Sequence, residues 1–191
     1  MGYINRLNIA PLWLLLLLTA PMGFAMSSEQ MTKTAHQFSF VAIDGKALPL
    51  SKYAGKAVLV VNTASRCGFT RQYADLQYLW KRYQERGLVV LGVPSNDFGG
   101  QEPGTEAEIK AFCEVNFDVD FPMTEKTLVK GNGAHPFYRW AGDSFGAMSQ
   151  PRWNFHKYLI TPDGHLADWF SSITSPRSER LMRAVEAVLP K

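Results

Sequence analysis

The sequence predicts an α/β fold in which a central mixed β-sheet is flanked by helices. Two continuous apolar, β-branched runs, 56–64 (KAVLVVNTA) and 88–94 (LVVLGVP), are typical of strands buried on both faces. Between them, apolar residues three and four positions apart mark one face of a helix. A strand, a helix and a strand in this order favour a parallel pair joined by a right-handed crossover.

The elements before and between these strands have recognisable end signals. The segment 38–45 (FSFVAIDG) alternates apolar and small residues and ends in Asp-Gly, which is a hairpin signal. The helix is expected over 70–86, with Thr70 as its N-cap and Gly87 as its stop. Its expected inward face consists of Tyr73, Leu76, Leu79, Trp80 and Tyr83.

The second half of the chain adds a helix, a hairpin and a closing helix. Thr105 and Glu108 form a capping-box pattern, and Ile109 starts the apolar face of the helix that follows. Segment 157–170 reads as two strands around a Pro-Asp-Gly turn, and 176–188 reads as the closing helix. This order predicts a parallel pair with an antiparallel edge, for which a thioredoxin-like fold is the leading candidate.

The first 25 residues have the layout of a secretory signal peptide. Arg6 precedes an apolar run at 12–18, and small residues lead to Ala25. The alternative is an uncleaved membrane anchor, but the run is shorter than the ~20 apolar residues that span a bilayer. We therefore expect cleavage after Ala25, one domain over 26–191, and no stable membrane insertion afterwards. Export to the periplasm is expected if the source is a Gram-negative bacterium.

Composition and charge exclude several classes of protein. The chain has 46% hydrophobic residues and five tryptophans, which indicate a packed globular domain. Its formal net charge is +3, and loss of Arg6 with the signal peptide would leave +2. This balance gives no reason to expect nucleic acid or a membrane surface as a partner. The four histidines show no ligand spacing with a cysteine, so neither a metal nor a cofactor is expected.

Cys67, in ASRCGFT, lies between a buried strand and the expected start of a helix. Free N–H groups and the helix dipole favour a thiolate at such a position, and Arg66 can add positive potential. Gly68 allows another group to approach closely. An accessible thiolate of this kind is a nucleophile for an electrophilic substrate.

Other roles for Cys67 remain open on these observations. Two cysteines in an exported chain can form a structural disulfide. The CxxT spacing lacks the second thiol of a CxxC redox motif, and no local signature supports Cys–His hydrolysis. The alternatives to a nucleophile are thus a periplasmic thiol–disulfide oxidoreductase and a non-catalytic module with a structural disulfide between Cys67 and Cys113.

Three separated segments carry a resemblance to a known family. NTASRCGFT, PSNDFGGQEPG and RWNFHKYLI, in this order, resemble the signature segments of the glutathione peroxidases in their cysteine form. The similarity extends over about residues 38–189. It implies a thioredoxin fold, reduction of hydrogen peroxide and organic hydroperoxides, and a role in the response to oxidative stress.

The resemblance also implies an active-site group. Cys67 matches the peroxidatic cysteine, Gln101 matches the glutamine of the second segment, and Trp153 and Asn154 match the pair in the third. The chemistry agrees, because a peroxide needs a thiolate to attack it and donors for the oxygen that leaves with negative charge. Glutamine, indole and asparagine are neutral donors, so they do not quench the nucleophile by an ion pair.

Cys113 matches the resolving cysteine of the thioredoxin-dependent branch, within FCEVNFDVDFP. On that interpretation it forms a disulfide with Cys67, which a thioredoxin-like protein or glutathione then reduces. The alternative is that Cys113 is only a small apolar residue on the inner face of its helix. Two positions depart from the pattern: Ser95 stands where many relatives carry another cysteine, and Asp97 stands where glutamine is frequent. Since no assembly insertion or cationic cluster for glutathione is present, we expect a monomer with a protein reductant.

Overall fold

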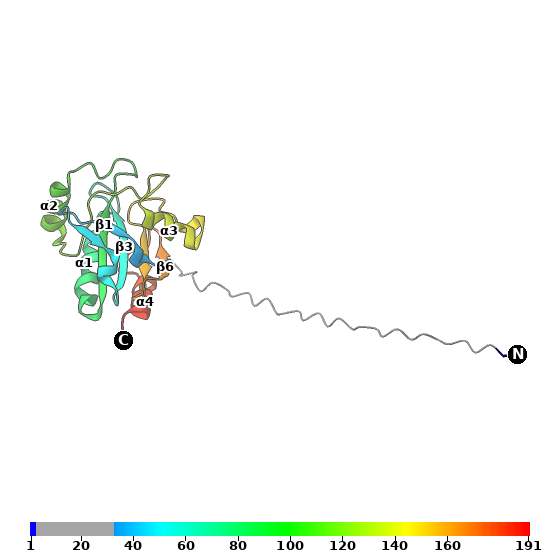
Figure 1. The fold of residues 1–191 in the computed structure, drawn as a ribbon. Helices are drawn as coiled ribbons and strands as arrows, with labels where there is room; N and C mark the ends of the chain where they lie inside the picture. The colour runs from blue at the N-terminus through cyan, green and yellow to red at the C-terminus, as the bar shows by residue number, and fades with distance from the viewer. Residues whose placement is uncertain (3–32) are drawn as a thin grey trace. The chain divides into compact units, whose positions relative to one another are not determined.

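A four-stranded mixed sheet runs through the domain (Figure 1). The computed structural model describes residues 1–2 and 33–191, so the predicted signal-peptide core and the cleavage point lie outside the described residues. Residues 33–191 form one unit. Among the described residues, no helix combines the length and the apolar character that a membrane span requires.

The sheet has the strand order β4-β3-β5-β6. β3 (Ala57–Thr63) and β4 (Leu88–Pro94) are parallel, and all residues of both strands are buried, as their apolar runs predict. β5 (Lys157–Ile160) pairs antiparallel with β3, and β6 (Leu166–Phe170) pairs antiparallel with β5. The predicted parallel pair with an antiparallel edge is therefore confirmed.

A separate hairpin precedes this sheet. β1 (Ser39–Val41) and β2 (Ala47–Pro49) are antiparallel. The Asp-Gly turn between them places Gly45 at φ 83°, a conformation that favours glycine. This hairpin confirms the sequence prediction for the segment.

Four α-helices accompany the sheet in the described part of the chain. They are α1 (Gln72–Tyr83), α2 (Glu106–Phe117), α3 (Pro136–Phe145) and α4 (Glu179–Val188). The predicted capping box of α2 is present, since Thr105 and Glu108 each accept the other's backbone N–H.

The start of α1 differs from the prediction. Thr70 is not its N-cap: α1 begins at Gln72 without a side-chain cap. The Thr70 hydroxyl instead accepts the Cys67 N–H at 3.0 Å and donates to the Ala64 carbonyl at 2.9 Å. A threonine hydroxyl can serve either use, and here it closes the turn around Cys67. Gly87, at φ 89°, stops the helical segment as predicted.

Helix α3 is not among the elements that the sequence predicts. Its start nevertheless carries two usual signals. Pro136 occupies the first turn, and the His135 ring accepts the Phe137 N–H at 3.2 Å. The segment PFYRWAGDSF also mixes glycine, serine and aromatic residues, which weakens a helical pattern read from sequence alone.

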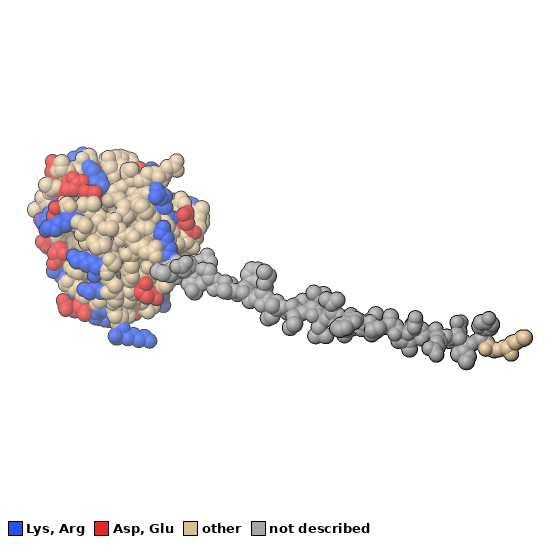
Figure 2. All heavy atoms as spheres, in the orientation of Figure 1, with Lys and Arg blue, Asp and Glu red and all other residues tan. Residues whose placement is uncertain are grey.

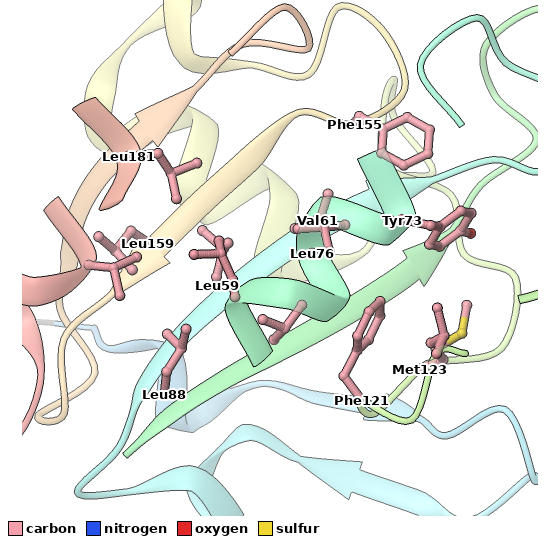
Figure 3. Packing of buried hydrophobic residues seen from close by; sticks show 14 of the residues in the cluster. Leu59, Val61, Tyr73, Leu76, Leu88, Phe121, Met123, Phe155, Leu159 and Leu181 are labelled. Carbon is pink, nitrogen blue, oxygen red and sulfur yellow. The ribbon is translucent and has the colours of Figure 1, made fainter. Parts of the chain in front are cut away.

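Two apolar layers cover the sheet on opposite faces. Alternate residues of β3 point to each face, so Leu59 and Val61 lie in one layer while Val58 and Val60 lie in the other. Figure 3 shows part of the first layer, with Tyr73 and Leu76 of α1 and Leu181 of α4. Helix α2 adds Ile109 and Cys113 to the same layer. The second layer contains α3 and the β1–β2 hairpin. This packing fixes the carboxyl ends of β3 and β4, from which the first two signature segments continue, and the start of β5, which the third segment enters.

Candidate active site

The Cys67 turn follows β3 directly and is held by several hydrogen bonds. The Cys67 N–H is bound by the Thr70 hydroxyl, and the Cys67 Sγ accepts the Phe69 N–H at 3.4 Å. A backbone N–H donated to sulfur stabilises a thiolate. Cys67 is buried, with only 9% of the residue exposed, so the structure does not show the accessible thiol that the sequence predicts. Both cysteines are free thiols.

Gln101 reaches the site through a glycine turn. Gly99 and Gly100 have φ 66° and 64°, and two successive residues in this region require the glycines of the segment FGGQ. The turn brings the Gln101 carbonyl onto the Arg66 N–H at 3.0 Å, beside Cys67. The second signature segment is thereby joined to the first through the backbone.

The third segment joins the second through side chains. Asn154 is fully buried, and its Nδ2 donates to Gln101 Oε1 at 2.9 Å. Because Gln101 Oε1 accepts this bond, the Gln101 NH2 group is free to donate to another acceptor. Trp153 is 39% exposed and packs on Phe98, with ring centroids 5.9 Å apart. The structure therefore brings the predicted donors Gln101 and Asn154 into direct contact.

Asn62 is a site residue that sequence reasoning missed. It is fully buried in β3, and its side-chain Nδ2 donates to the Trp153 carbonyl at 3.1 Å. Its backbone carbonyl accepts the Phe155 N–H at 2.6 Å. Phe155 has φ 64°, which is rare for a bulky residue. An asparagine within an otherwise apolar strand was the available signal, since a buried polar side chain needs partners.

Glu102 is a second residue of the site that was not predicted from the sequence. It is buried, at 1% exposure, next to Gln101, and burial raises the pKa of its carboxyl. Ser65 beside it opposes this shift. A cavity of about 230 Å³ lies here, between the Cys67 turn and the first turns of α2, and is lined by Glu102, Ser65 and Phe112 among others.

Cys113 occupies a very different environment from Cys67. It is fully buried on the inner face of α2. Burial raises the pKa of the Cys113 thiol to about 12, an effect that the neighbouring Tyr73 hydroxyl opposes. Cys113 is therefore a neutral thiol at ordinary pH. It also lines a cavity of about 320 Å³ between α2 and the β1–β2 hairpin.

The two positions that depart from the family pattern have structural roles. Ser95 is fully buried, and its hydroxyl accepts the Asp97 N–H at 3.4 Å. Asp97 Oδ2 accepts the backbone N–H groups of Val129 at 2.6 Å and Lys130 at 3.2 Å. Asp97 thus ties the loop before α3 to the loop that carries Gln101.

On the face in Figure 2, basic and acidic side chains are interspersed. The described residues contain no group of three or more His, Cys, Asp or Glu side chains that could hold a metal ion. The site therefore offers a thiol, neutral hydrogen-bond donors and a partly exposed indole. This chemistry suits attack on a small uncharged electrophile whose leaving oxygen needs donors.

Comparison with known proteins identifies the family. The glutathione peroxidase family model matches residues 35–141. A glutathione peroxidase-like peroxiredoxin of Chlamydomonas reinhardtii is 44% identical over 153 residues, covering 79% of this chain and 93% of that protein. A hydroperoxy fatty acid reductase of a Synechocystis species is 43% identical over 157 residues, covering 78% and 93%.

Solved structures agree with this relationship. A crystal structure of T. cruzi GPX1 superposes with a TM-score of 0.63 at 31% identity, covering 83% of this chain and 95% of that chain. A thioredoxin-family thiol:disulfide interchange protein of Chlorobium tepidum, at 21% identity and a TM-score of 0.58, shares the fold, covering 79% and 92%. The fold is thus thioredoxin-like, as predicted, and the chain belongs to the glutathione peroxidase family of hydroperoxide-reducing oxidoreductases.

Proposed function

We propose that this thiol peroxidase reduces hydroperoxides through Cys67. The Cys67 thiolate attacks one peroxide oxygen, so that an S–O bond forms and the O–O bond breaks. The other oxygen leaves as an alkoxide or hydroxide and takes up a proton to become an alcohol or water. Cys67 is left as a sulfenic acid, oxidised by two electrons.

Gln101, Trp153 and Asn154 are proposed to stabilise the negative charge that develops during this step. The hydrogen bond from Asn154 to Gln101 is the single observation that carries the proposal. It links two signature segments beside the Cys67 turn and orients the Gln101 amide so that its NH2 group can donate. One well-placed donor of this kind typically lowers a barrier by roughly 3 kcal/mol.

Cys113 is proposed to resolve the sulfenic acid. Its thiol sulfur attacks Cys67, a disulfide forms, and the sulfenic oxygen leaves as water. A thioredoxin-like dithiol protein, or glutathione, then reduces the disulfide. Because Cys113 is fully buried, α2 must open locally before the two sulfurs meet. The small number of buried residues in α2, which are Ile109 and Cys113 alone, supports such an opening.

The substrate class is proposed to include organic hydroperoxides as well as hydrogen peroxide. The exposed part of Trp153 and the neighbouring Phe98 give the site an apolar border. The name of the Synechocystis relative, a hydroperoxy fatty acid reductase, points the same way. We further propose that the protein is exported, loses residues 1–25 by signal-peptide cleavage and acts as a monomer, in the periplasm if the host is a Gram-negative bacterium.

A steady-state assay tests the proposed function. Hydrogen peroxide, an alkyl hydroperoxide and a fatty acid hydroperoxide are supplied with either thioredoxin or glutathione, using the wild type and Cys67→Ser in parallel. The proposal expects consumption of hydroperoxide by the wild type alone, faster with thioredoxin. Reduction of insulin disulfides without peroxide consumption would instead identify a thiol–disulfide oxidoreductase.

A further inference from the structure

Lys157 is a fully buried lysine in the centre of the sheet. It lies in β5, opposite Val61 of β3 and Phe170 of β6, and its exposed fraction is 0%. Lysine is almost never fully buried unless its ammonium is partnered. Burial lowers the pKa of Lys157 to about 7, and the Asp75 carboxylate opposes this shift. Such a costly arrangement calls for a local reason.

The Lys157 Nζ binds the segment that carries the proposed donors. It donates to the Phe155 carbonyl at 2.7 Å. Phe155 directly follows Trp153 and Asn154, and it is one of only two non-glycine residues with positive φ in the described chain. Its N–H is bound by the Asn62 carbonyl, so both polar groups of this rare backbone conformation are held.

The same nitrogen also binds the loop between β6 and α4. Lys157 Nζ donates to the Thr174 carbonyl at 2.8 Å. The loop around Thr174 is fixed to α1, since Gln72 Nε2 donates to the Ser172 carbonyl at 2.7 Å and the hydroxyl of Ser175 donates to Asp75 at 3.1 Å. Helix α1 follows the Cys67 turn. One side chain therefore connects the donor segment to the loop that is anchored on the helix after Cys67.

We propose that Lys157 is a positioning residue for hydroperoxide reduction: its Nζ fixes the Phe155 carbonyl and thereby aims Trp153 and Asn154 relative to Cys67. The proposal rests on the function proposed above for those three residues. Ammonium and amine forms of lysine both carry enough N–H groups for two hydrogen bonds. Methionine, with similar volume and no donor, would fill the space but release the carbonyl.

Lys157→Met and a matched control separate positioning from stability. Leu159→Ala, in the same strand and equally buried, destabilises the domain without touching the donor segment. Two single-turnover rates are measured at a temperature where each variant is folded: oxidation of Cys67 by hydrogen peroxide, and its alkylation by iodoacetamide, located by peptide mapping. Iodoacetamide needs the thiolate but has no leaving oxygen for the donors to stabilise.

The expected result is selective. Lys157→Met should lower the peroxide rate by roughly 10- to 100-fold, because small misplacements of donors are costly, while alkylation changes by less than about threefold. Leu159→Ala should lower the melting temperature but keep both rates within about threefold of wild type. Should Lys157→Met fail to fold, Lys157→Gln, which retains a shorter donor, is measured instead, and its peroxide rate should fall more than its alkylation rate.

A double-mutant cycle adds a measurement that does not depend on a loss of stability, namely the coupling between two substitutions in the peroxide rate. In a Trp153→Phe background, the effect of Lys157→Met on the peroxide rate should shrink, because the donor being aimed is already absent. An unchanged peroxide rate in Lys157→Met, equal losses in both reactions, or full additivity in the cycle would overturn the proposal. A wild type that does not reduce peroxide would instead refute the proposed function, so the two failures are distinguishable.

Discussion

The two cysteines lie in regions that are held to the rest of the domain to different degrees. Several hydrogen bonds hold the Cys67 turn in place. The Thr70 hydroxyl and the Gln101 carbonyl accept N–H groups of the turn, and the Phe69 N–H donates to the Cys67 sulfur. By contrast, α2 buries only two of its twelve residues, whereas α1 buries six of its twelve. The apolar side chain of Val115 on α2 is even 82% exposed.

This difference matches the different demands of the two proposed steps. Attack on a peroxide needs a fixed nucleophile and fixed donors, because rate depends steeply on alignment. Resolution needs a thiol that can leave its place, and weakly packed segments open at low cost. In the proposed cycle, the rigid turn would serve the attack on peroxide and the loosely held helix would serve the resolution step.

Replacement of Cys67 should have the largest effect. Cys67→Ser should lower hydroperoxide consumption by at least about a thousandfold, since the nucleophile is lost while the fold remains. The measurement is peroxide consumption, with circular dichroism as the control for folding. Substantial residual turnover would show that another residue is the nucleophile, and the contrast between the two cysteine regions would then have no catalytic meaning.

Replacement of Cys113 should separate the two steps. In Cys113→Ser, the first reduction of one equivalent of peroxide should keep its rate within about twofold, whereas turnover with thioredoxin should stop. Stopped-flow oxidation and a steady-state assay on the same sample measure these effects. Normal turnover with thioredoxin would show that the opening of α2 has no part in the cycle.

Trp153→Phe tests whether the indole N–H contributes to the peroxide rate in the rigid region. The change removes the indole N–H but keeps an aromatic ring against Phe98, so the peroxide rate should fall by roughly 10- to 100-fold. Trp140→Phe, a tryptophan of α3 outside the candidate site, is the matched control and should be neutral. Equal behaviour of the two variants would remove Trp153 from the donor set.

The pH dependence of stability probes the loosely held region and is the smallest effect. In the unfolded chain Cys113 ionises near its ordinary pKa of 9.0, whereas in the folded protein burial raises its pKa to about 12. Between these values the unfolded state holds fewer protons, so stability is fully present below pH 9 and falls as pH rises. The loss has an upper limit of about 1.4 kcal/mol per pH unit.

Urea unfolding of reduced wild type and Cys113→Ala from pH 8 to 11 measures this effect. The difference in unfolding free energy between the two proteins should change steadily above pH 9, with the wild type losing stability. Comparison with the variant removes contributions from other groups that titrate in the same range. A difference that stays constant over this range would mean that Cys113 is already solvated in the folded state.

The sequence predicted the parts of the fold that local pattern determines. Continuous apolar runs identified β3 and β4, and the capping box identified the start of α2. Thr70 was assigned wrongly because its hydroxyl could cap a helix or close a turn, and only the packed structure chooses. Helix α3 was missed because its composition weakens the periodic signal.

Sequence motifs predicted only the residues that are proposed to take part directly in the reaction. Cys67, Gln101, Trp153 and Asn154 came from motifs, whereas the support beneath them comes from distant positions. Asn62 binds the Trp153 carbonyl from 91 residues away. In the sequence, Lys157 is simply one polar residue in a predicted strand. Only the folded structure places its nitrogen between the Phe155 and Thr174 carbonyls. Such partnerships depend on tertiary contacts that no local pattern encodes.

Peptide mapping of the reduced protein after one equivalent of hydroperoxide tests the central claim most directly. A fixed Cys67 and a releasable Cys113 predict that the main product is a peptide pair joined by a disulfide between these two residues. Recovery of Cys67 in a higher oxidation state, with Cys113 still a free thiol inside an intact α2, would contradict the account.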